Sequence, residues 1–174
     1  MTYADSNNHW LPGDQEVDHE YPVCLSVVVP VYNEAATLGV VVRKLLSVPC
    51  LFEIIIVDDC STDGTEQKAR ELAELYEQVR VVRHERNAGK TAALRTGFAL
   101  TTGQVVIVQD ADLEYDPAEI YGVIRPILEG HADVVVTLRR FRSRSQGEDV
   151  VVGPRVVTRT PPARVAEGRQ RDGV

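Results

Sequence analysis

Two aspartates separated by one residue are the sharpest chemical feature of the sequence. Asp110 and Asp112 come directly after the apolar run 105–108. In an extended segment, side chains two residues apart point to the same side. Carboxylates are hard oxygen ligands that suit Mg²⁺ or Mn²⁺, and such an ion usually bridges to phosphates. The alternative is a polar turn before a helix, and we assign Glu114 and Asp116 mainly to that turn and its cap.

A second pair of carboxylates follows another apolar run, residues 52–57. Asp58 and Asp59 are adjacent, and one of them could accept a hydrogen bond from a nucleobase N–H. The alternative is that the polar residues here only cap the next helix. We interpret Thr62 and Asp63 mainly as caps, and expect one of the two aspartates to bind a ligand.

A lysine at a helix start is a candidate phosphate contact. The run Gly89-Lys90-Thr91 suggests a phosphate loop, but His84 stands where a Walker A motif requires its first glycine. This excludes a Walker A site. Lys90 could still face a phosphate at the helix N-terminus, and an ordinary turn with an N-cap is an equal alternative.

The segment after the first apolar run, residues 24–30, carries an aromatic ring, an amide and a carboxylate. These belong to Tyr32, Asn33 and Glu34, and Pro30 ends the strand ladder. We expect these side chains to face the crevice at the strand ends. We also expect the segment to form a loop in which Asn33 caps the following helix.

Alternating strands and helices must position these segments. The hydrophobic pattern predicts strands at 24–30, 52–57, 79–83, 105–108 and 133–136, and helices at 38–46, 65–78, 90–101 and 116–130. This order predicts an α/β fold with a largely parallel sheet covered by helices on both faces. Ligands of such sheets bind at the carboxyl ends of the strands, where the polar segments lie.

Composition narrows the classes of function. The chain has 174 residues and a net charge of −7, which argues against broad nucleic-acid binding. Three cysteines without a CxxC pair argue against a disulfide framework or a zinc site. Reduced thiols in a cytosolic compartment are the simpler interpretation. No apolar run reaches the roughly 18 residues that span a bilayer, which still allows a membrane substrate.

Charge and composition divide the chain into three parts. Residues 1–22 contain acids but no Lys or Arg, and predict a disordered leader. Up to residue 136 the chain has ten basic and twenty-two acidic residues, whereas 137–174 has nine Arg and four acids. We therefore expect a folded domain at 23–138 and an aberrant, disordered basic tail at 139–174.

Four segments in combination resemble family 2 glycosyltransferases. They are Val29–Glu34, Ile56–Thr65, Asn87–Gly97 and Gln109–Pro117. They are most similar to the branch of dolichyl- and polyprenyl-phosphate mannosyl- and glucosyltransferases, over roughly residues 24–136. No GxGxxG follows the first strand, which argues against a doubly wound oxidoreductase.

The resemblance implies a GT-A, Rossmann-like fold that is truncated, a GDP- or UDP-sugar donor, Mg²⁺ or Mn²⁺, and inversion at the anomeric carbon. It implies a polyprenyl-phosphate acceptor at the cytoplasmic membrane surface. By position, it implies that the base and ribose are lined by Pro30, Tyr32 and Glu34. The nucleoside would also be held by Val57 and Asp59, with Asp58 close by. The sugar, the diphosphate and the metal would contact Asp110, Ala111 and Asp112. Asp112 would be the most direct metal ligand, and Asp110 and Asp112 the catalytic pair.

The sequence departs from the family after the fifth strand. Family members continue with an Arg–aromatic pair that touches the donor phosphates, and Arg139 or Arg140 could stand in for it here. From Arg142 onward neither a helical nor a strand period is visible. This predicts a frameshifted or shortened reading frame, and the alternative is a natural short form. The second functional hypothesis is accordingly an inactive fragment that binds nucleotide sugar.

Overall fold

The computed structural model describes residues 24–142 and 149–159, and side chains within residues 24–136 and at residues 157–158. Seven of the described helices and strands precede Asp110 and Asp112, and four follow them. The strands are β1 (Leu25–Val31), β2 (Leu51–Asp58), β3 (Val79–Arg83), β4 (Val105–Val108), β5 (Val134–Arg142) and β6 (Asp149–Arg159). The helices are α1 (Leu38–Leu45), α2 (Thr65–Leu75), α3 (Lys90–Leu100), the 3-10 turn η1 (Pro117–Glu119) and α4 (Ile120–Leu128).

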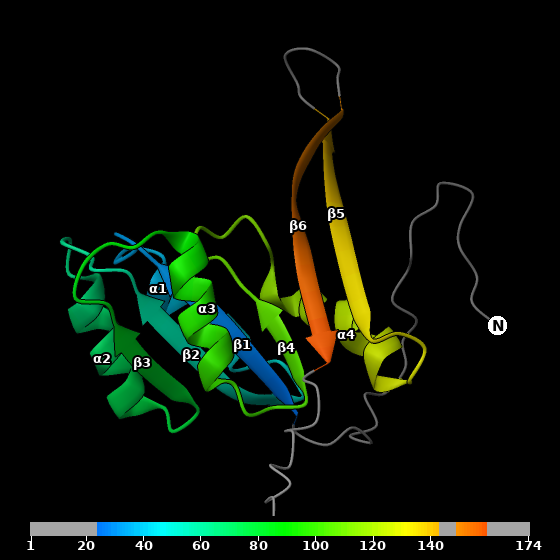
Figure 1. Cartoon of the computed structure of the whole chain (residues 1–174), viewed down its shortest axis with the longest axis horizontal. Coiled ribbons are helices and arrows are strands. Elements are labelled where there is room, and N and C mark those ends of the chain that lie inside the picture. Colours follow the sequence, from blue (N-terminus) through cyan, green and yellow to red (C-terminus); the bar gives the residue numbers. More distant parts are fainter. Residues whose placement is uncertain (1–23, 143–148, 160–174) are drawn as a thin grey trace, which may run out of the picture.

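The strands form one mixed sheet in the order β3-β2-β1-β4-β6-β5 (Figure 1). The first four strands are parallel, as the alternation of elements predicts. The register sets Val31 of β1 beside Asp58 of β2, and Asp58 beside Arg83 of β3. The carboxyl ends of these strands therefore meet at one edge of the sheet, and the polar segments follow there.

Helices cover both faces of the sheet. Buried side chains of α1, α2 and α4 form the main core cluster with one face, while Ala93 of α3 packs with Ile55 and Val57 on the other. Burial on both sides explains why β1, β2 and β4 are largely apolar runs rather than alternating ones. The helices thereby hold the strand ends, and the loops that leave them, in fixed positions.

Helix α3 lies unusually close to the sheet because Gly97 faces Val28 of β1. A Cβ at position 97 would stand 2.3 Å from Val28 Cγ1. Such a separation is not possible for two carbon atoms, so a side chain at residue 97 would push the helix outward. The glycine thus sets the distance between α3, which carries Lys90, and the site.

We expect Gly97→Ala to lower the free energy of unfolding by about 1–3 kcal/mol through overpacking. The matched control is Gly122→Ala in α4, where an added Cβ meets nothing within 4 Å. The control should be neutral or stabilising, since alanine favours helix by about 1 kcal/mol over glycine. Urea denaturation of both variants measures the difference. A Gly97→Ala variant as stable as the parent would contradict the close packing.

The expected irregular tail is wrong for residues 139–142 and 149–159. Residues 139–142 continue β5, and residues 149–159 form β6, which pairs antiparallel with both β4 and β5. Val157 of β6 is fully buried. Pairing with β4 supplies hydrogen bonds that local sequence does not reveal. The expected leader, and residues 143–148 and 160–174 of the expected tail, lie outside the described residues.

Among the described residues, no helix is both long and apolar enough to cross a membrane.

Candidate functional site

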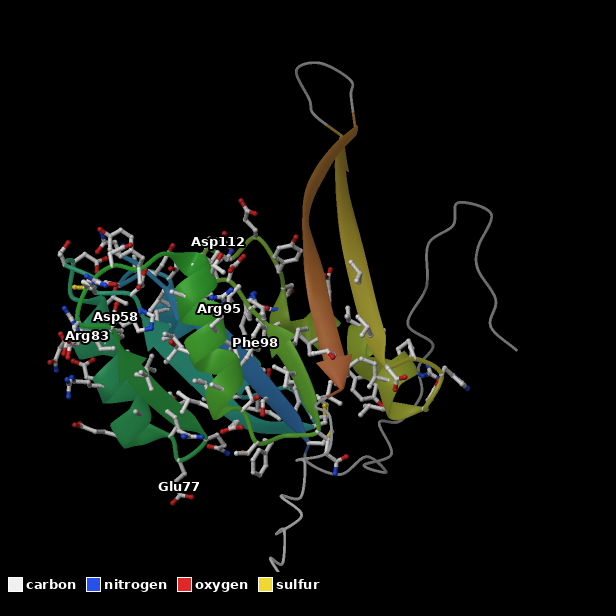
Figure 2. All side chains as sticks on the ribbon, viewed as in Figure 1. Asp58, Glu77, Arg83, Arg95, Phe98 and Asp112 are labelled. Atoms are coloured by element: carbon white, nitrogen blue, oxygen red, sulfur yellow. The ribbon has the colours of Figure 1, made fainter. Side chains whose placement is uncertain are left out.

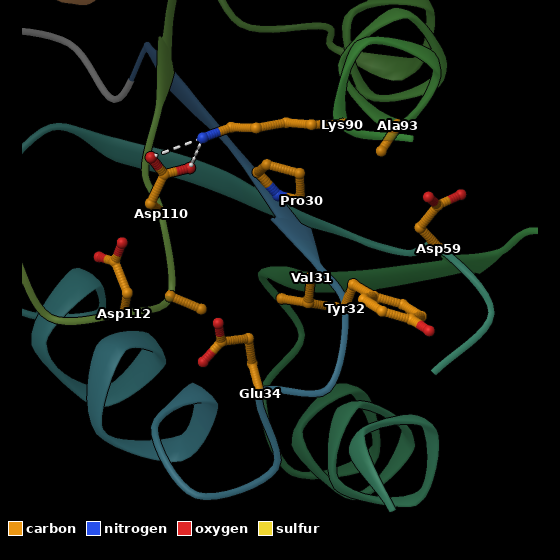
Figure 3. Close-up of a pocket in the computed structure, with 10 residues that line it drawn as sticks. Pro30, Val31, Tyr32, Glu34, Asp59, Lys90, Ala93, Asp110 and Asp112 are labelled. Carbon is orange, nitrogen blue, oxygen red and sulfur yellow. Dashed lines mark hydrogen bonds and ion pairs between the residues drawn. The ribbon is translucent and has the colours of Figure 1, made fainter. Parts of the chain in front are cut away.

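An open cleft lies at the carboxyl edge of the sheet, between the loops after β1, β2 and β4 and the first turn of α3 (Figure 3). Figure 2 places Asp112 at this end of the molecule and Glu77, before β3, at the opposite end. The residues that line the cleft are Pro30, Val31, Tyr32, Glu34, Asp59, Lys90, Ala93, Asp110, Ala111 and Asp112. Eight of these ten are site candidates from the sequence.

Two lining residues were missed by the sequence analysis. Val31 lies between two candidates in the same extended segment, so its position could have been found. Ala93 lies three residues after Lys90, on the same side of α3, and is buried. Its small side chain leaves room in the cleft, and only the helix assignment points to it.

Three predicted candidates do not line the cleft. Val57 is fully buried under α3, where it packs with Ile55 and Ala93. Asp58 is fully buried beneath the loop after β2. The backbone of Arg139 lies in β5, opposite Val152 of β6, and its side chain is outside the described part of the structure.

The adjacent aspartates Asp58 and Asp59 have different surroundings. Asp58 Oδ2 lies 3.1 Å from Arg83 Nη1, and the two residues stand side by side in Figure 2. Its Oδ1 accepts hydrogen bonds from the backbone N–H and the hydroxyl of Ser61. Asp58 therefore stabilises the loop from inside. Asp59 is the member of the pair that faces the cleft, a choice that the sequence left open.

Asp59 is the most tightly held carboxylate in the cleft. Oδ1 accepts from Ala88 N at 2.9 Å and lies 2.7 Å from His84 Nδ1, while Oδ2 accepts from Gly89 N at 2.7 Å. Burial by itself would raise the pKa of Asp59, but the hydrogen bonds from Ala88, His84 and Gly89 lower it below the ordinary value. The site thus contains a fixed, ionised acceptor.

Lys90 reaches across the cleft to Asp110. Its Nζ lies 2.8 Å from each carboxylate oxygen of Asp110 (Figure 3). The preceding Gly89 serves as the N-cap of α3 with φ = 85°, a conformation that favours glycine. Lys90 is therefore both the first residue of the helix and a positive charge inside the site, so the two interpretations from sequence are compatible.

A buried glutamine supports the segment that contains Asp110 and Asp112. The side chain of Gln109 is fully buried, and its Nε2 donates to the carbonyl oxygens of Asp110 (3.0 Å) and Tyr115 (3.1 Å). Asp112 Oδ1 accepts from Glu114 N at 3.0 Å. These bonds close the loop and leave the Asp112 side chain exposed at the cleft. The sequence analysis did not find the role of Gln109.

Asp116 behaves as expected from its sequence. Its Oδ1 accepts from Ala118 N at 3.2 Å, so it caps the turn η1, and Pro117 follows as the first helical residue. The chain then enters α4.

The expected cap by Asn33 is wrong. Thr37 is the N-cap residue of α1, and Asn33 has φ = 59°. Asn33 Oδ1 instead accepts from Thr62 N at 2.8 Å, and Glu34 N donates to Thr65 Oγ1 at 2.8 Å. The loops after β1 and β2 are thereby tied together. Such bonds between distant segments have no local sequence pattern.

The carboxylates in the cleft fit a divalent cation. The described residues contain no group of three or more His, Cys, Asp or Glu side chains arranged to hold a metal by themselves. Asp110 and Asp112 nevertheless offer two hard oxygen donors at one end of the cleft (Figure 3). Mg²⁺ and Mn²⁺ suit such a pair, because they often take their remaining ligands from water and substrate phosphates.

Comparison with known proteins agrees with this architecture. Dodecaprenyl-phosphate galacturonate synthase of Rhizobium johnstonii is 34% identical over 123 residues, 68% of this chain and 36% of that protein. Undecaprenyl-phosphate 4-deoxy-4-formamido-L-arabinose transferase of Aeromonas hydrophila is 37% identical over 126 residues, 70% of this chain and 38% of that protein. The chain thus spans less than two fifths of the length of these curated relatives.

A solved structure extends the comparison to three dimensions. Glucosyl-3-phosphoglycerate synthase from Mycobacterium tuberculosis, in complex with Mn²⁺, uridine-diphosphate and phosphoglyceric acid, has a TM-score of 0.54 and 30% sequence identity. The alignment covers 64% of this chain and 41% of that one. The GT-A fold that the sequence predicts is confirmed by this similarity.

The family model described as glycosyl transferase family 2 matches residues 26–170. The matched range includes the cleft and continues past residue 142, into the segment where the sequence suggests an aberrant reading frame. More than half of the chain is matched, and the chain belongs to glycosyl transferase family 2.

Proposed function

We propose that the cleft binds a nucleotide-diphosphate sugar, and that the protein transfers this sugar with inversion to a polyprenyl phosphate. The observation that carries the proposal is the separation of two kinds of group in one cleft. Tyr32 and the fixed acceptor Asp59 lie at one end, and Lys90, Asp110 and Asp112 at the other (Figure 3). A nucleoside would occupy the first end and a diphosphate the second.

The nucleoside end offers an exposed ring and a carboxylate. The Tyr32 side chain is 49% exposed, so its face is available for contact with a base or ribose. Asp59 Oδ2 accepts one backbone hydrogen bond, from Gly89 N, and a carboxylate oxygen has two acceptor positions. The base would donate an N–H to Asp59, with Pro30 and Glu34 forming the adjacent wall.

The diphosphate end combines opposite charges. Asp110 and Asp112 would hold Mg²⁺ or Mn²⁺, and the bound ion would neutralise the charge that develops on the leaving diphosphate. Lys90 Nζ, which pairs with Asp110, would also donate a hydrogen bond to a phosphate oxygen. The ion pair with Asp110 keeps Lys90 at the place where that phosphate would lie.

Support for this acceptor comes from the two curated relatives, whose names specify dodecaprenyl and undecaprenyl phosphate. A phosphate acceptor is already an anion, so its attack on the sugar requires no general base. The chain's task is then to orient donor and acceptor. We place this activity at the cytoplasmic membrane face, where a lipid phosphate would meet a nucleotide sugar.

The test is calorimetric titration of the chain with UDP and GDP, with and without Mn²⁺, followed by a transfer assay with undecaprenyl phosphate. Metal-dependent binding of one nucleotide supports the donor site and identifies the base. Failure of a folded chain to bind either nucleotide would overturn it. Binding without transfer would favour the second candidate, a nucleotide-sugar binder without turnover.

We expect Tyr32→Ala to weaken nucleotide binding about tenfold, equivalent to about 1.4 kcal/mol, while Mn²⁺ dependence persists. The reason is that the ring contributes contact area but no metal ligand. Calorimetry with the bound nucleotide measures both quantities, and Tyr32→Phe serves as the control that retains the ring. Loss of the Mn²⁺ dependence with unchanged affinity in metal-free buffer would contradict the role given to Tyr32.

A further inference from the structure

Both ring nitrogens of His84 have partners in the described structure, although the side chain does not line the cleft. Nδ1 lies 2.7 Å from Asp59 Oδ1, and Nε2 lies 2.9 Å from Thr96 Oγ1 of α3. The imidazole is only 16% exposed. His84 therefore links the carboxylate of the nucleoside end to the helix that carries Lys90.

The direction of these hydrogen bonds follows from the chemistry of the partners. An ionised carboxylate can only accept, so His84 Nδ1 must carry a proton and donate it to Asp59. In neutral histidine the other nitrogen, Nε2, is then an acceptor. The Thr96 hydroxyl donates to it. The ionised Asp59 carboxylate thus selects the Nδ1–H tautomer of His84, and the Thr96 hydroxyl, which can donate or accept, is compatible with it.

We propose that His84 is a positioning residue: with its ring held between Asp59 and Thr96, it donates from Nδ1 and orients the Asp59 carboxylate for the nucleoside. The role in binding rests on the proposed function of the cleft. His84 and Ala88 N occupy Oδ1, whereas Oδ2 accepts from Gly89 N and has a second acceptor position for a ligand N–H. Gly89 is the N-cap residue of α3. The hydrogen bond from Gly89 N to Asp59 Oδ2 therefore also helps to place Lys90, the next residue, opposite Asp110.

Two substitutions of His84 separate positioning from simple space filling. The amide nitrogen of asparagine falls near the place of Nδ1, whereas that of glutamine falls near the place of Nε2. His84→Asn should therefore retain the donor to Asp59, and His84→Gln should lose it. By calorimetry with the nucleotide that the parent binds, we expect affinity to fall about tenfold for His84→Gln and less than about threefold for His84→Asn.

The control is His131→Asn. The His131 side chain is 74% exposed and contacts Glu129 after α4, so its replacement should leave nucleotide affinity unchanged. Equal losses of affinity in His84→Asn and His84→Gln would overturn the positioning role, because space filling alone does not distinguish the two.

A second measurement needs no nucleotide. Nitrogen-15 NMR of the imidazoles at pH 8, with the His84 signals assigned from their absence in His84→Asn, should show a protonated Nδ1 and an unprotonated Nε2. Thr96→Val should shift the Nε2 signal. A protonated Nε2 with an unprotonated Nδ1 would overturn the proposal.

Hydrogen exchange distinguishes failure of this inference from failure of the proposed function. The Ala88 and Gly89 amides, which donate to Asp59, should exchange faster in His84→Gln than in His84→Asn. If the parent chain binds neither nucleotide, the donor-site proposal fails. Exchange rates and tautomer then still decide whether His84 orients Asp59. Equal exchange in both variants would contradict the positioning role.

Discussion

Replacing Asp112 with asparagine should abolish the Mn²⁺-dependent part of nucleotide binding. The substitution removes one negative charge and one anionic ligand from the diphosphate end, while asparagine keeps the shape of the side chain. Its Oδ1 can still accept from Glu114 N, as that of Asp112 does, so the loop should remain closed. We expect a loss of affinity in Mn²⁺ on the order of 100-fold, equivalent to about 2.8 kcal/mol.

The measurement is calorimetry with UDP and GDP in Mn²⁺ and in EDTA. Glu114→Gln is the matched control, because Glu114 lies in the same loop, is exposed, and does not line the cleft. The control should bind nucleotide more tightly in Mn²⁺ than in EDTA, as the parent chain is expected to do. If Asp112→Asn also binds more tightly in Mn²⁺, the metal assignment is wrong and the ion, if bound, has other ligands.

Replacing Asp59 with asparagine should lower both stability and nucleotide affinity. Three donors point at this carboxylate, from Ala88 N, Gly89 N and His84 Nδ1. An asparagine amide group has one oxygen and one NH₂, so at least one buried donor would face another donor. A buried unsatisfied donor costs about 1–3 kcal/mol. The affinity should fall at least about tenfold, because the base would lose its acceptor.

The same carboxylate should give a defined pH dependence. Hydrogen bonds hold the pKa of Asp59 below its ordinary value. Its contribution to stability is therefore fully present above the unfolded-state pKa, and is lost as pH falls through the folded-state pKa. Guanidinium denaturation between pH 7 and pH 3 should show this loss in the parent chain, and a smaller pH dependence in Asp59→Asn.

Asp58→Asn provides the control for position. Asp58 is fully buried and paired with Arg83, so this variant should lose stability as well. Under conditions where both variants are folded, however, Asp58→Asn should bind nucleotide as the parent does. A larger loss of affinity in Asp58→Asn than in Asp59→Asn would reverse the assignment of the two aspartates.

Periodic apolar runs were sufficient to predict the parallel part of the fold. The apolar residues of β1, β2 and β4 mark these strands as buried. The rule that ligands bind at the carboxyl ends of parallel strands then placed Asp59, Lys90, Asp110 and Asp112 in one region. All four line the cleft. Their roles toward donor and metal stay predictions.

The remaining features depend on contacts between distant residues. Two adjacent acids must point in different directions after a strand, but it takes the contacts of Asp58 with Arg83 and Ser61 to show that Asp59 is the one that faces the cleft. The Asn33 side chain could cap a helix or bond to a neighbouring loop, and in the structure its Oδ1 accepts a hydrogen bond from Thr62 N. The Arg and Pro residues of β6 suggested irregular structure. The strand forms because it pairs with the edge of β4, about fifty residues earlier in the chain, and this pairing has no local sequence signal.

The position of β6 between β4 and β5 has a consequence for the order of assembly. β5 is synthesised first, yet it contacts the rest of the sheet only through β6. If the parallel half folds before β6 is in place, the edge of β4 that β6 covers stays open. An open edge favours pairing with other chains. β5 and β6 can add to β4 together as a hairpin, so the interval between folding of the parallel half and addition of this hairpin is the one in which the fold is most exposed to aggregation.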